Sequence, residues 1–183
     1  MTEKKEIRKL HNSLRDGIES GLKKSAEKEI AIKILKKYGK AIEEKGILFV
    51  YAPIKSEVNL SDMYNYLKNR GVKLAYPRVY KKEMDFYLCN DESDFFTGSF
   101  NVPEPKEYCK KVFPDKDFFI VPGLVFNDLN ERIGYGAGYY DRYFSRFPGN
   151  IKIGVCFKNQ IDNDFKADEH DISMDDVFHD ELI

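Results

Sequence analysis

Cysteine is scarce in this chain, and its three cysteines, Cys89, Cys109 and Cys156, show no C-x-x-C spacing. An odd number without that spacing argues against a disulfide framework and against a zinc site, and it indicates a reducing compartment. Cys89 and Cys156 lie within apolar runs typical of strands, which predicts buried free thiols. The N-terminal segment lacks a hydrophobic signal region, and no apolar run approaches the roughly 18 residues of a membrane span, so we expect a cytoplasmic protein.

The chain also lacks a strong charge of either sign. Its 183 residues carry a formal net charge of −1, which gives no electrostatic reason to expect nucleic acid or an anionic membrane as the partner. Hydrophobic residues make up 42% and charged residues 33%, the balance of a globular protein rather than a disordered one. The length suits one substantial core, so we expect a single domain over residues 1–183.

The most informative stretch runs from residue 117 to residue 146. An apolar run of strand length, Phe118 to Val121, is followed by R-I-G-Y-G-A-G-Y-Y-D-R, with glycines at Gly134, Gly136 and Gly138. Apolar spacing from Tyr140 to Phe147 then predicts a helix. A glycine-rich loop that leads into a helix presents backbone N–H groups and a partial positive dipole, which favours phosphate.

Two common phosphate motifs are absent. No glycine is followed by Lys-Ser or Lys-Thr as a P-loop requires, and the third glycine of G-x-G-x-x-G would fall at Tyr139. A glycine-rich turn without a ligand remains the plain alternative, because glycine is used wherever φ must be positive. The neighbours favour the functional interpretation, since Arg132 and Arg142 can neutralise phosphate oxygens and Asp141 can hold Mg²⁺.

The string P-G-L-V-F-N…R-I-G-Y-G-A-G-Y-Y-D-R-Y-F resembles the signature of the 5-formyltetrahydrofolate cyclo-ligases, also called 5,10-methenyltetrahydrofolate synthetases. Weaker matches occur in the family's order over nearly the whole chain: Lys4 and Arg8, Glu57-Val58-Asn59, Tyr76-Pro77-Arg78, Glu104-Pro105, Gln160 and Glu169-His170-Asp171. No catalytic triad, catalytic cysteine or H-E-x-x-H is recognisable, which suits a mechanism driven by the substrates.

The resemblance implies which residues form the site. The implied ATP-binding residues are Lys4, Arg8, Arg132, Ile133, Gly134, Tyr135, Gly136, Ala137, Gly138, Tyr139 and Tyr140; the implied folate-binding residues are Glu57 and the loop from Tyr135 to Tyr139; the implied Mg²⁺ ligands are Asp141 and Asp171. Lys5 is an alternative to Lys4 as the residue that reaches the phosphates. Many family members carry lysine at the position of Ala137, so one phosphate-binding cation is missing from the loop, and Arg142 or a lysine elsewhere is expected to compensate.

The reaction that the resemblance implies is ATP-dependent ring closure of 5-formyltetrahydrofolate to 5,10-methenyltetrahydrofolate through a phosphorylated iminium, by a monomer or weak dimer. Two alternatives remain: an ATP-dependent enzyme of the same fold with another small-molecule acceptor, and an inactive nucleotide- or folate-binding protein. A nucleic-acid binder is disfavoured by the balanced charge.

The pattern of elements predicts a three-layer α/β domain with a mainly parallel sheet, and the family's architecture resembles the sugar-phosphate isomerase and CoA-transferase-like group. We expect helices over residues 3–22, 26–38 and 62–70, with Ile7, Leu10, Leu14 and Ile18 as the buried stripe of the first. Strands are expected over residues 46–52, 72–76, 84–89, 118–121 and 151–157, the third antiparallel or at an edge. Residues 90–116 are expected to form a long surface loop with little helix. In open parallel sheets ligands bind beyond the carboxyl ends of the strands, which places Glu57 and Arg78 near a ligand.

Overall fold

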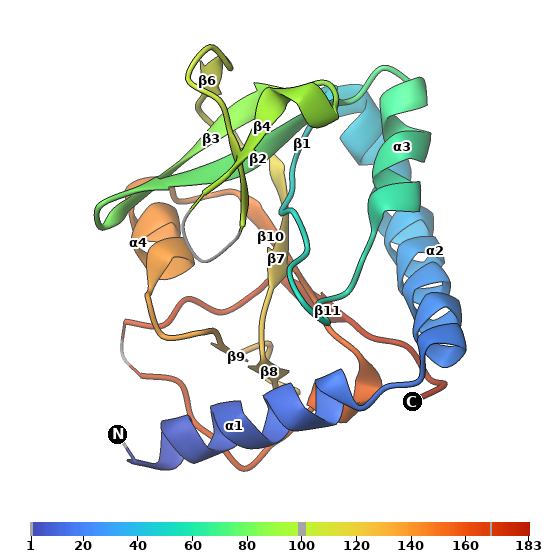
Figure 1. The fold of residues 1–183 in the computed structure, drawn as a ribbon, viewed down its shortest axis with the longest axis vertical. Coiled ribbons are helices and arrows are strands. Elements are labelled where there is room, and N and C mark those ends of the chain that lie inside the picture. Colours follow the sequence, from blue (N-terminus) through green and yellow to red (C-terminus); the bar gives the residue numbers. More distant parts are fainter. Residues whose placement is uncertain (1, 99–101, 169) are drawn as a thin grey trace.

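The computed structural model describes residues 2–98, 102–168 and 170–183. At its centre lies a seven-stranded sheet (Figure 1). Its spatial order is β11 (Asp176–Phe178), β10 (Ile151–Val155), β7 (Phe118–Pro122), β1 (Ile47–Phe49), β2 (Lys73–Tyr80), β3 (Glu83–Cys89) and β6 (Lys111–Val112). The five strands from β11 to β2 are parallel, whereas β3 runs antiparallel to both β2 and β6. The prediction of a mainly parallel sheet with an antiparallel strand over residues 84–89 is confirmed.

Helices cover both faces of the sheet, because its central strands alternate two sets of apolar side chains. Leu48 and Ile120 pack on one side with α2 (Ser20–Lys45) and α3 (Ser61–Asn69). Phe49 and Phe119 point to the other side and pack with Tyr143 and Phe144 of α4 (Tyr139–Arg146). The result is the expected three-layer α/β arrangement, with α2 and α3 on the opposite side of the sheet from α4 in Figure 1.

The first two helices differ from the sequence prediction in their boundaries. Helix α1 (Thr2–Asp16) ends six residues before the predicted residue 22, and α2 begins at Ser20, six residues before the predicted residue 26, with Glu19 as its N-cap. The Glu19 carboxylate accepts two backbone N–H groups at that end. Helix α2 continues through Gly39, which is buried within it, and ends at Gly46 in the left-handed conformation.

Strand β2 is longer than predicted, because Pro77 does not end it. The parallel partner β1 reaches only to Ala75, so beyond that residue β2 has a neighbour on one side alone. Proline is tolerated on such an edge, where its missing N–H group is not required. By contrast β1 and β10 are shorter than predicted, at Ile47–Phe49 and Ile151–Val155.

The described residues between 90 and 116 contain little helix, as expected, but they are not all loop. They include a 3₁₀ turn (Glu92–Asp94), the paired strands β4 (Phe95–Thr97) and β5 (Pro103–Pro105), and β6. Phe95 packs edge-on against Tyr76, whereas Phe96 is 40% exposed.

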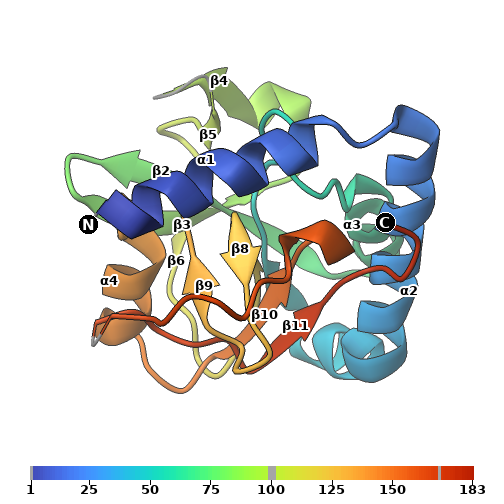
Figure 2. The same cartoon turned by 90° about the horizontal axis from the view of Figure 1, so that it is seen from below.

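Helix α1 lies across the carboxyl ends of the parallel strands (Figure 2). It contacts β8 (Val125–Phe126), which follows β7, and the 3₁₀ turn η3 (Lys158–Gln160), which follows β10. The predicted apolar stripe is wrong for two of its four residues, because Leu10 is 55% and Leu14 is 43% exposed. Ile7 and Ile18 pack against buried clusters, although Ile18 lies beyond the end of the helix. The side of α1 that faces the body of the protein is instead mostly polar.

Candidate active site

The inward side of α1 carries Lys4, Arg8, His11 and Arg15, spaced four, three and four residues apart on one helical face. Ile7 adds the apolar contact, packing against the cluster that contains Ile133 and Phe165. His11 bonds the carbonyl of Asn159 and the carboxylate of Asp162, which fixes α1 to the segment after β10. The polar residues of α1 therefore lie over the carboxyl edge of the sheet, where a parallel α/β fold binds its ligands.

The glycine-rich loop connects β9 (Arg132–Ile133) to α4. Gly136 has φ 99° and Gly138, the N-cap of α4, has φ 65°. Both values lie in the left-handed region, which explains glycine at these positions. The guanidinium of Arg8 bonds the Gly134 carbonyl at 2.9 Å and lies against Gly136. Arg8 is thus beside the loop, and Lys5, the alternative to Lys4, is exposed.

The two predicted metal ligands lie close together. The Asp141 carboxylate accepts the N–H group of Ile172 at 3.2 Å, and Ile172 is the neighbour of Asp171. Arg132 is paired with Asp141 at 3.0 Å, and Lys4 is paired with Asp171 at 2.8 Å. Within the described ranges no group of three or more histidine, cysteine or acidic side chains is arranged to hold a metal.

Lys4 also pairs with Asp168, at 2.6 Å, a contact that sequence reasoning missed. Burial alone would raise the pKa of Asp171, but hydrogen bonds from Lys4 and from the Asp168 amide hold it below its ordinary value. Asp171 is therefore fully ionised at neutral pH. In this structure Lys4 and Arg132 are neutralised by carboxylates of the site, whereas Arg8 bonds a backbone carbonyl.

Glu57 lies in the loop between β1 and α3 and is buried, at 5% exposure. One carboxylate oxygen accepts the Ile54 N–H group. Burial raises the pKa of Glu57, an effect that the Ile54 N–H, the nearby Arg15 charge and the Tyr135 hydroxyl partly offset. Glu57 therefore lies near Tyr135 of the glycine-rich loop, and its role in folate binding stays a prediction.

Other predicted residues have structural partners. Ile133 is buried in the core, and Tyr139 donates its hydroxyl to the Lys81 carbonyl. Arg142, the suggested substitute for a loop lysine, donates to the carbonyl of Ala137 and to that of Lys82. The guanidinium of Arg142 therefore stabilises the loop, and its N–H groups already have backbone carbonyl partners. Ala137 itself is exposed.

Gln160 and Arg78, also noted in the sequence, have side-chain contacts in the structure. Gln160 is buried, and its amide nitrogen donates to the carbonyls of Gly123 and Leu124, which fixes the turn after β7. Arg78 lies 3.7 Å from Glu107 and 5.5 Å from the ring centre of Phe96.

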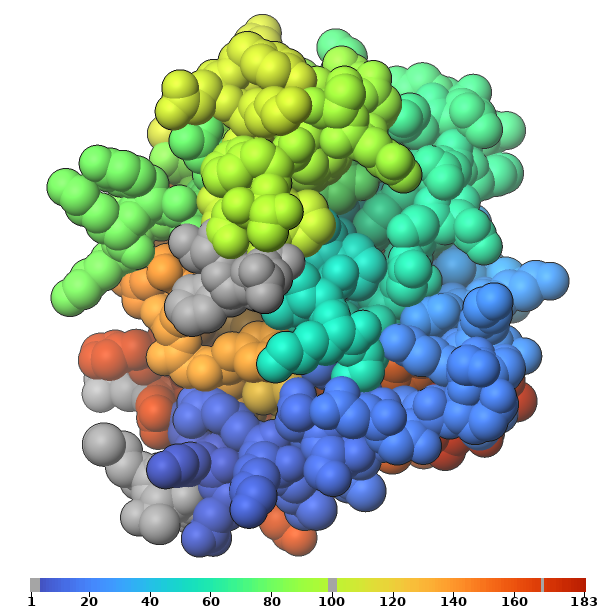
Figure 3. All heavy atoms as spheres, in the orientation of Figure 1, coloured from blue at the N-terminus to red at the C-terminus, as the bar shows by residue number. Residues whose placement is uncertain are grey.

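The main residue that sequence reasoning missed is Arg15, which is 1% exposed and bonds Tyr135. The signal was available in the spacing of Lys4, Arg8, His11 and Arg15, which place one polar stripe along the helix. On the space-filling surface α1 (blue), the loop after β1 (teal) and the glycine-rich region (orange) meet on one face (Figure 3).

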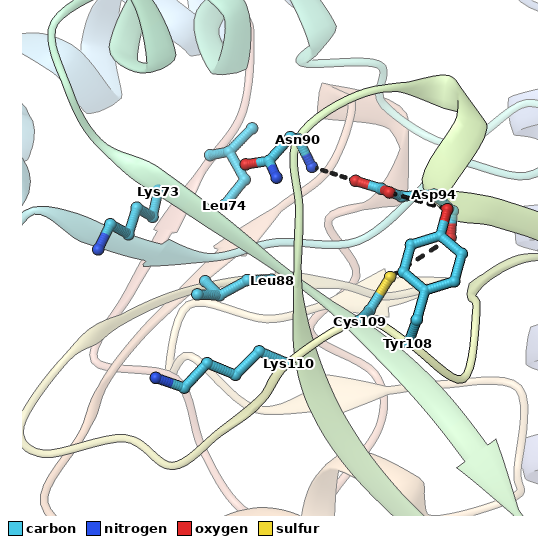
Figure 4. A pocket seen from close by; sticks show the side chains of 8 residues that line it. All are labelled: Lys73, Leu74, Leu88, Asn90, Asp94, Tyr108, Cys109 and Lys110. Carbon is cyan, nitrogen blue, oxygen red and sulfur yellow. Dashed lines mark hydrogen bonds between the residues drawn. The ribbon is translucent and has the colours of Figure 1, made fainter.

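A separate cavity of about 320 Å³ lies at the start of β2 and the end of β3 (Figure 4). It is lined on one side by Asn90, Asp94, Tyr108 and Cys109 and holds none of the predicted site residues. Cys89 and Cys156 are free and buried, as predicted, and so is Cys109. No helix in the described part of the chain is long and apolar enough to cross a membrane.

A sequence model of the 5-formyltetrahydrofolate cyclo-ligase family matches residues 1–180. The chain belongs to this family. The 5-formyltetrahydrofolate cyclo-ligase of Mycoplasma pneumoniae is 33% identical over 134 residues, covering 72% of this chain and 71% of the relative. A probable 5-formyltetrahydrofolate cyclo-ligase of Caenorhabditis elegans is 26% identical over 193 residues, covering 94% of each chain.

Solved structures agree with this assignment. The 5,10-methenyltetrahydrofolate synthetase of Aquifex aeolicus superposes with a TM-score of 0.84 at 26% identity, covering 97% of this chain and 90% of that one. The enzyme from Mycoplasma pneumoniae gives a TM-score of 0.77 at 27% identity, covering 95% and 96%. The family, the enzyme class and the α/β fold predicted from the sequence are confirmed.

Proposed function

We propose that this cyclo-ligase uses ATP to convert 5-formyltetrahydrofolate into 5,10-methenyltetrahydrofolate, with release of ADP and phosphate. The observation that carries the proposal is that Arg8 and Arg132 lie against the glycine-rich loop, near the buried carboxyl group of Glu57. A third cation, Lys4, is paired with Asp171, whose neighbour Ile172 bonds Asp141. Cations and backbone N–H groups suit the triphosphate, and a carboxyl group suits the hydrogen-bond donors of a folate ring system. A reducing compartment and a monomeric or weakly dimeric state belong to the same proposal.

The formyl oxygen of 5-formyltetrahydrofolate is a poor leaving group, so ring closure requires its activation. The formyl oxygen attacks the γ-phosphate of ATP and ADP leaves, which gives a phosphorylated iminium at nitrogen 5 of the folate. Nitrogen 10 then attacks the formyl carbon, loses its proton, and phosphate departs with the former formyl oxygen. The protein contributes mainly by holding two substrates in line and by neutralising the phosphate charge.

Mg²⁺ is the metal expected with ATP, and the residues present fit it. Mg²⁺ typically binds one or two protein carboxylates and completes its shell with phosphate oxygens and water, so a larger acidic cluster is not required. Asp141 and Asp171 would hold the ion, and its charge would offset the developing negative charge on the phosphates. For this to happen, Lys4 and Arg132 exchange their carboxylate partners for phosphate oxygens.

The test is the growth of the methenyltetrahydrofolate absorbance band with purified protein, 5-formyltetrahydrofolate and Mg²⁺, with and without ATP. We expect growth that depends on ATP, stops on chelation of Mg²⁺, and is abolished by Asp141→Asn. This variant keeps the oxygen that accepts the Arg132 and Ile172 hydrogen bonds, so the fold is preserved. Tight binding of folate or ATP without growth would contradict the proposal and indicate an inactive binding protein.

A further inference from the structure

Arg15 is the most deeply buried charged side chain of α1, and it joins three segments of the site. Its Nε donates to the Ser56 hydroxyl at 2.9 Å, and its Nη2 donates to the Tyr135 hydroxyl at 2.8 Å. Ser56 is the neighbour of Glu57, and Tyr135 belongs to the glycine-rich loop. A single guanidinium group therefore fixes the loop after β1 relative to the loop between β9 and α4.

The Tyr135 hydroxyl connects Arg15 with Glu57. Because it accepts a hydrogen bond from Arg15, its own proton is free to be donated, and the Glu57 carboxyl group lies near enough to interact with it electrostatically. The second contact of Glu57, from the Ile54 N–H group, holds the other side of the carboxyl. The position of Glu57 thus depends on a short chain of contacts that begins at Arg15.

Anchoring of the helix does not require an arginine at this position. Ile7 and His11 already fix α1 to the body of the protein, through the cluster of Phe165 and through Asn159 and Asp162. A buried guanidinium is costly to desolvate, and Nη1 of Arg15 has no hydrogen-bond partner although it is fully buried. A cost of this kind is typical of a functional site rather than of a stabilising contact.

We propose that Arg15 is a positioning residue for the folate half of the site, acting on Glu57 through the hydroxyl of Tyr135 and through Ser56. This inference rests on the proposed function, in which Glu57 binds the folate. Lys4, Arg8 and Arg132 remain on the nucleotide side. Loss of Arg15 therefore acts selectively on the folate and leaves the binding of ATP nearly unchanged.

The experiment compares Arg15→Lys, Tyr135→Phe and the double variant with the wild-type protein. Lysine keeps the charge but cannot reach Ser56 and Tyr135 together, since it lacks the planar fork of arginine. We expect each single change to raise the KM for 5-formyltetrahydrofolate about tenfold or more, the usual effect of losing a charge-assisted hydrogen bond, while the KM for ATP changes less than about twofold. The double variant should be little worse than either single one, because both changes break the same chain.

Leu14→Gln is the matched control, since Leu14 adjoins Arg15 on α1 but is largely exposed. It should leave both KM values unchanged. Dissociation constants for 5-formyltetrahydrofolate without ATP, from calorimetry, give a readout that does not depend on turnover, and they should follow the KM values. If Arg15→Lys does not fold, Tyr135→Phe still tests the inference. Tyr135 is 47% exposed, so loss of its hydroxyl should not unfold the protein.

Four results would overturn the inference. Equal increases in both KM values, or a lower melting temperature with unchanged KM values, would show that Arg15 only supports the fold. A wild-type protein that binds no 5-formyltetrahydrofolate would refute the proposed function and this inference with it. A wild-type protein that binds and cyclises the folate, together with a Tyr135→Phe variant that behaves identically, would refute the role of Arg15 alone.

Discussion

Replacing Asp141 by alanine should destabilise the protein far more than replacing it by asparagine. Arg132 is almost fully buried, with a side-chain exposure of 6%, and its partner Asp141 is 20% exposed. Nε of Arg132 already lacks a partner. Removing the carboxylate therefore leaves a buried guanidinium with one weak hydrogen bond, to the Pro122 carbonyl at 3.4 Å.

The size of the effect follows from the burial of the pair. Removing one partner of a buried ion pair costs about 3–5 kcal/mol, and the partial exposure of Asp141 argues for the lower end, about 3 kcal/mol. For a chain of this size each kcal/mol lowers the melting temperature by about 2–4 °C, so Asp141→Ala should melt about 6–12 °C below the wild type. Asp141→Asn should cost about 1 kcal/mol, because both hydrogen bonds described for Asp141 use Oδ1, which an amide oxygen can replace.

Thermal unfolding followed by circular dichroism, together with the absorbance assay, separates stability from activity. Both variants should be inactive if Asp141 holds Mg²⁺. The double variant Arg132→Met/Asp141→Ala should be more stable than Asp141→Ala, because it removes the unpaired buried charge. Equal melting temperatures for the alanine and asparagine variants, or a double variant less stable than Asp141→Ala, would refute this account of the pair.

Three further predictions concern the fold, the acidic group and the loop. Gly154→Ala should cost about 1–3 kcal/mol by overpacking, because a Cβ there would lie 2.6 Å from the Phe126 ring; chemical denaturation should show a smaller cost in a Phe126→Leu background, and an equal cost would contradict it. Burial raises the pKa of Glu57 above 4.5, so the ionised carboxylate opposes folding. Glu57→Gln should therefore become more stable relative to the wild type as pH rises from 4.5 through the raised pKa, and this advantage should disappear below pH 4.5. A difference in melting temperature that does not vary with pH would exclude this effect. Ala137→Lys should lower the KM for ATP about threefold or more by adding an ammonium group to an exposed loop position, with Ala137→Gln as the uncharged control, and equal effects of the two would argue against a charge contribution.

The three layers of the fold were predictable because every residue along the two central strands, β1 and β7, is apolar, on both faces of the sheet. Leu48, Phe49 and Val50 are all buried, as are Phe119, Ile120 and Val121, so both strands read as continuous apolar runs and imply cover on both faces. The end of β2 was not predictable in the same way. Whether Pro77 stops a strand depends on whether a neighbour needs its N–H group, and that depends on the length of β1 rather than on β2 itself.

The site was predictable wherever a residue type was demanded by the local chain, as in the glycines with positive φ before α4. It was not predictable where a side chain acts across the fold. Arg15 is separated from Tyr135 by 120 residues. Its spacing from the other basic residues of α1 shows which face of the helix it shares, but not which side chain it contacts across the fold.

Helix α1 shows why hydrophobic periodicity fails for an element that lies over a candidate binding site. The usual rule assumes that the buried face of a helix meets an apolar core. Here the buried face meets the carboxyl edge of the sheet, where Lys4, Arg8 and Arg15 have carboxylate, carbonyl and hydroxyl partners, so the polar residues point inward and Leu10 and Leu14 point to solvent. A short helix with basic residues spaced four, three and four apart, next to a glycine-rich phosphate motif elsewhere in the chain, should therefore be oriented by its charges rather than by its leucines.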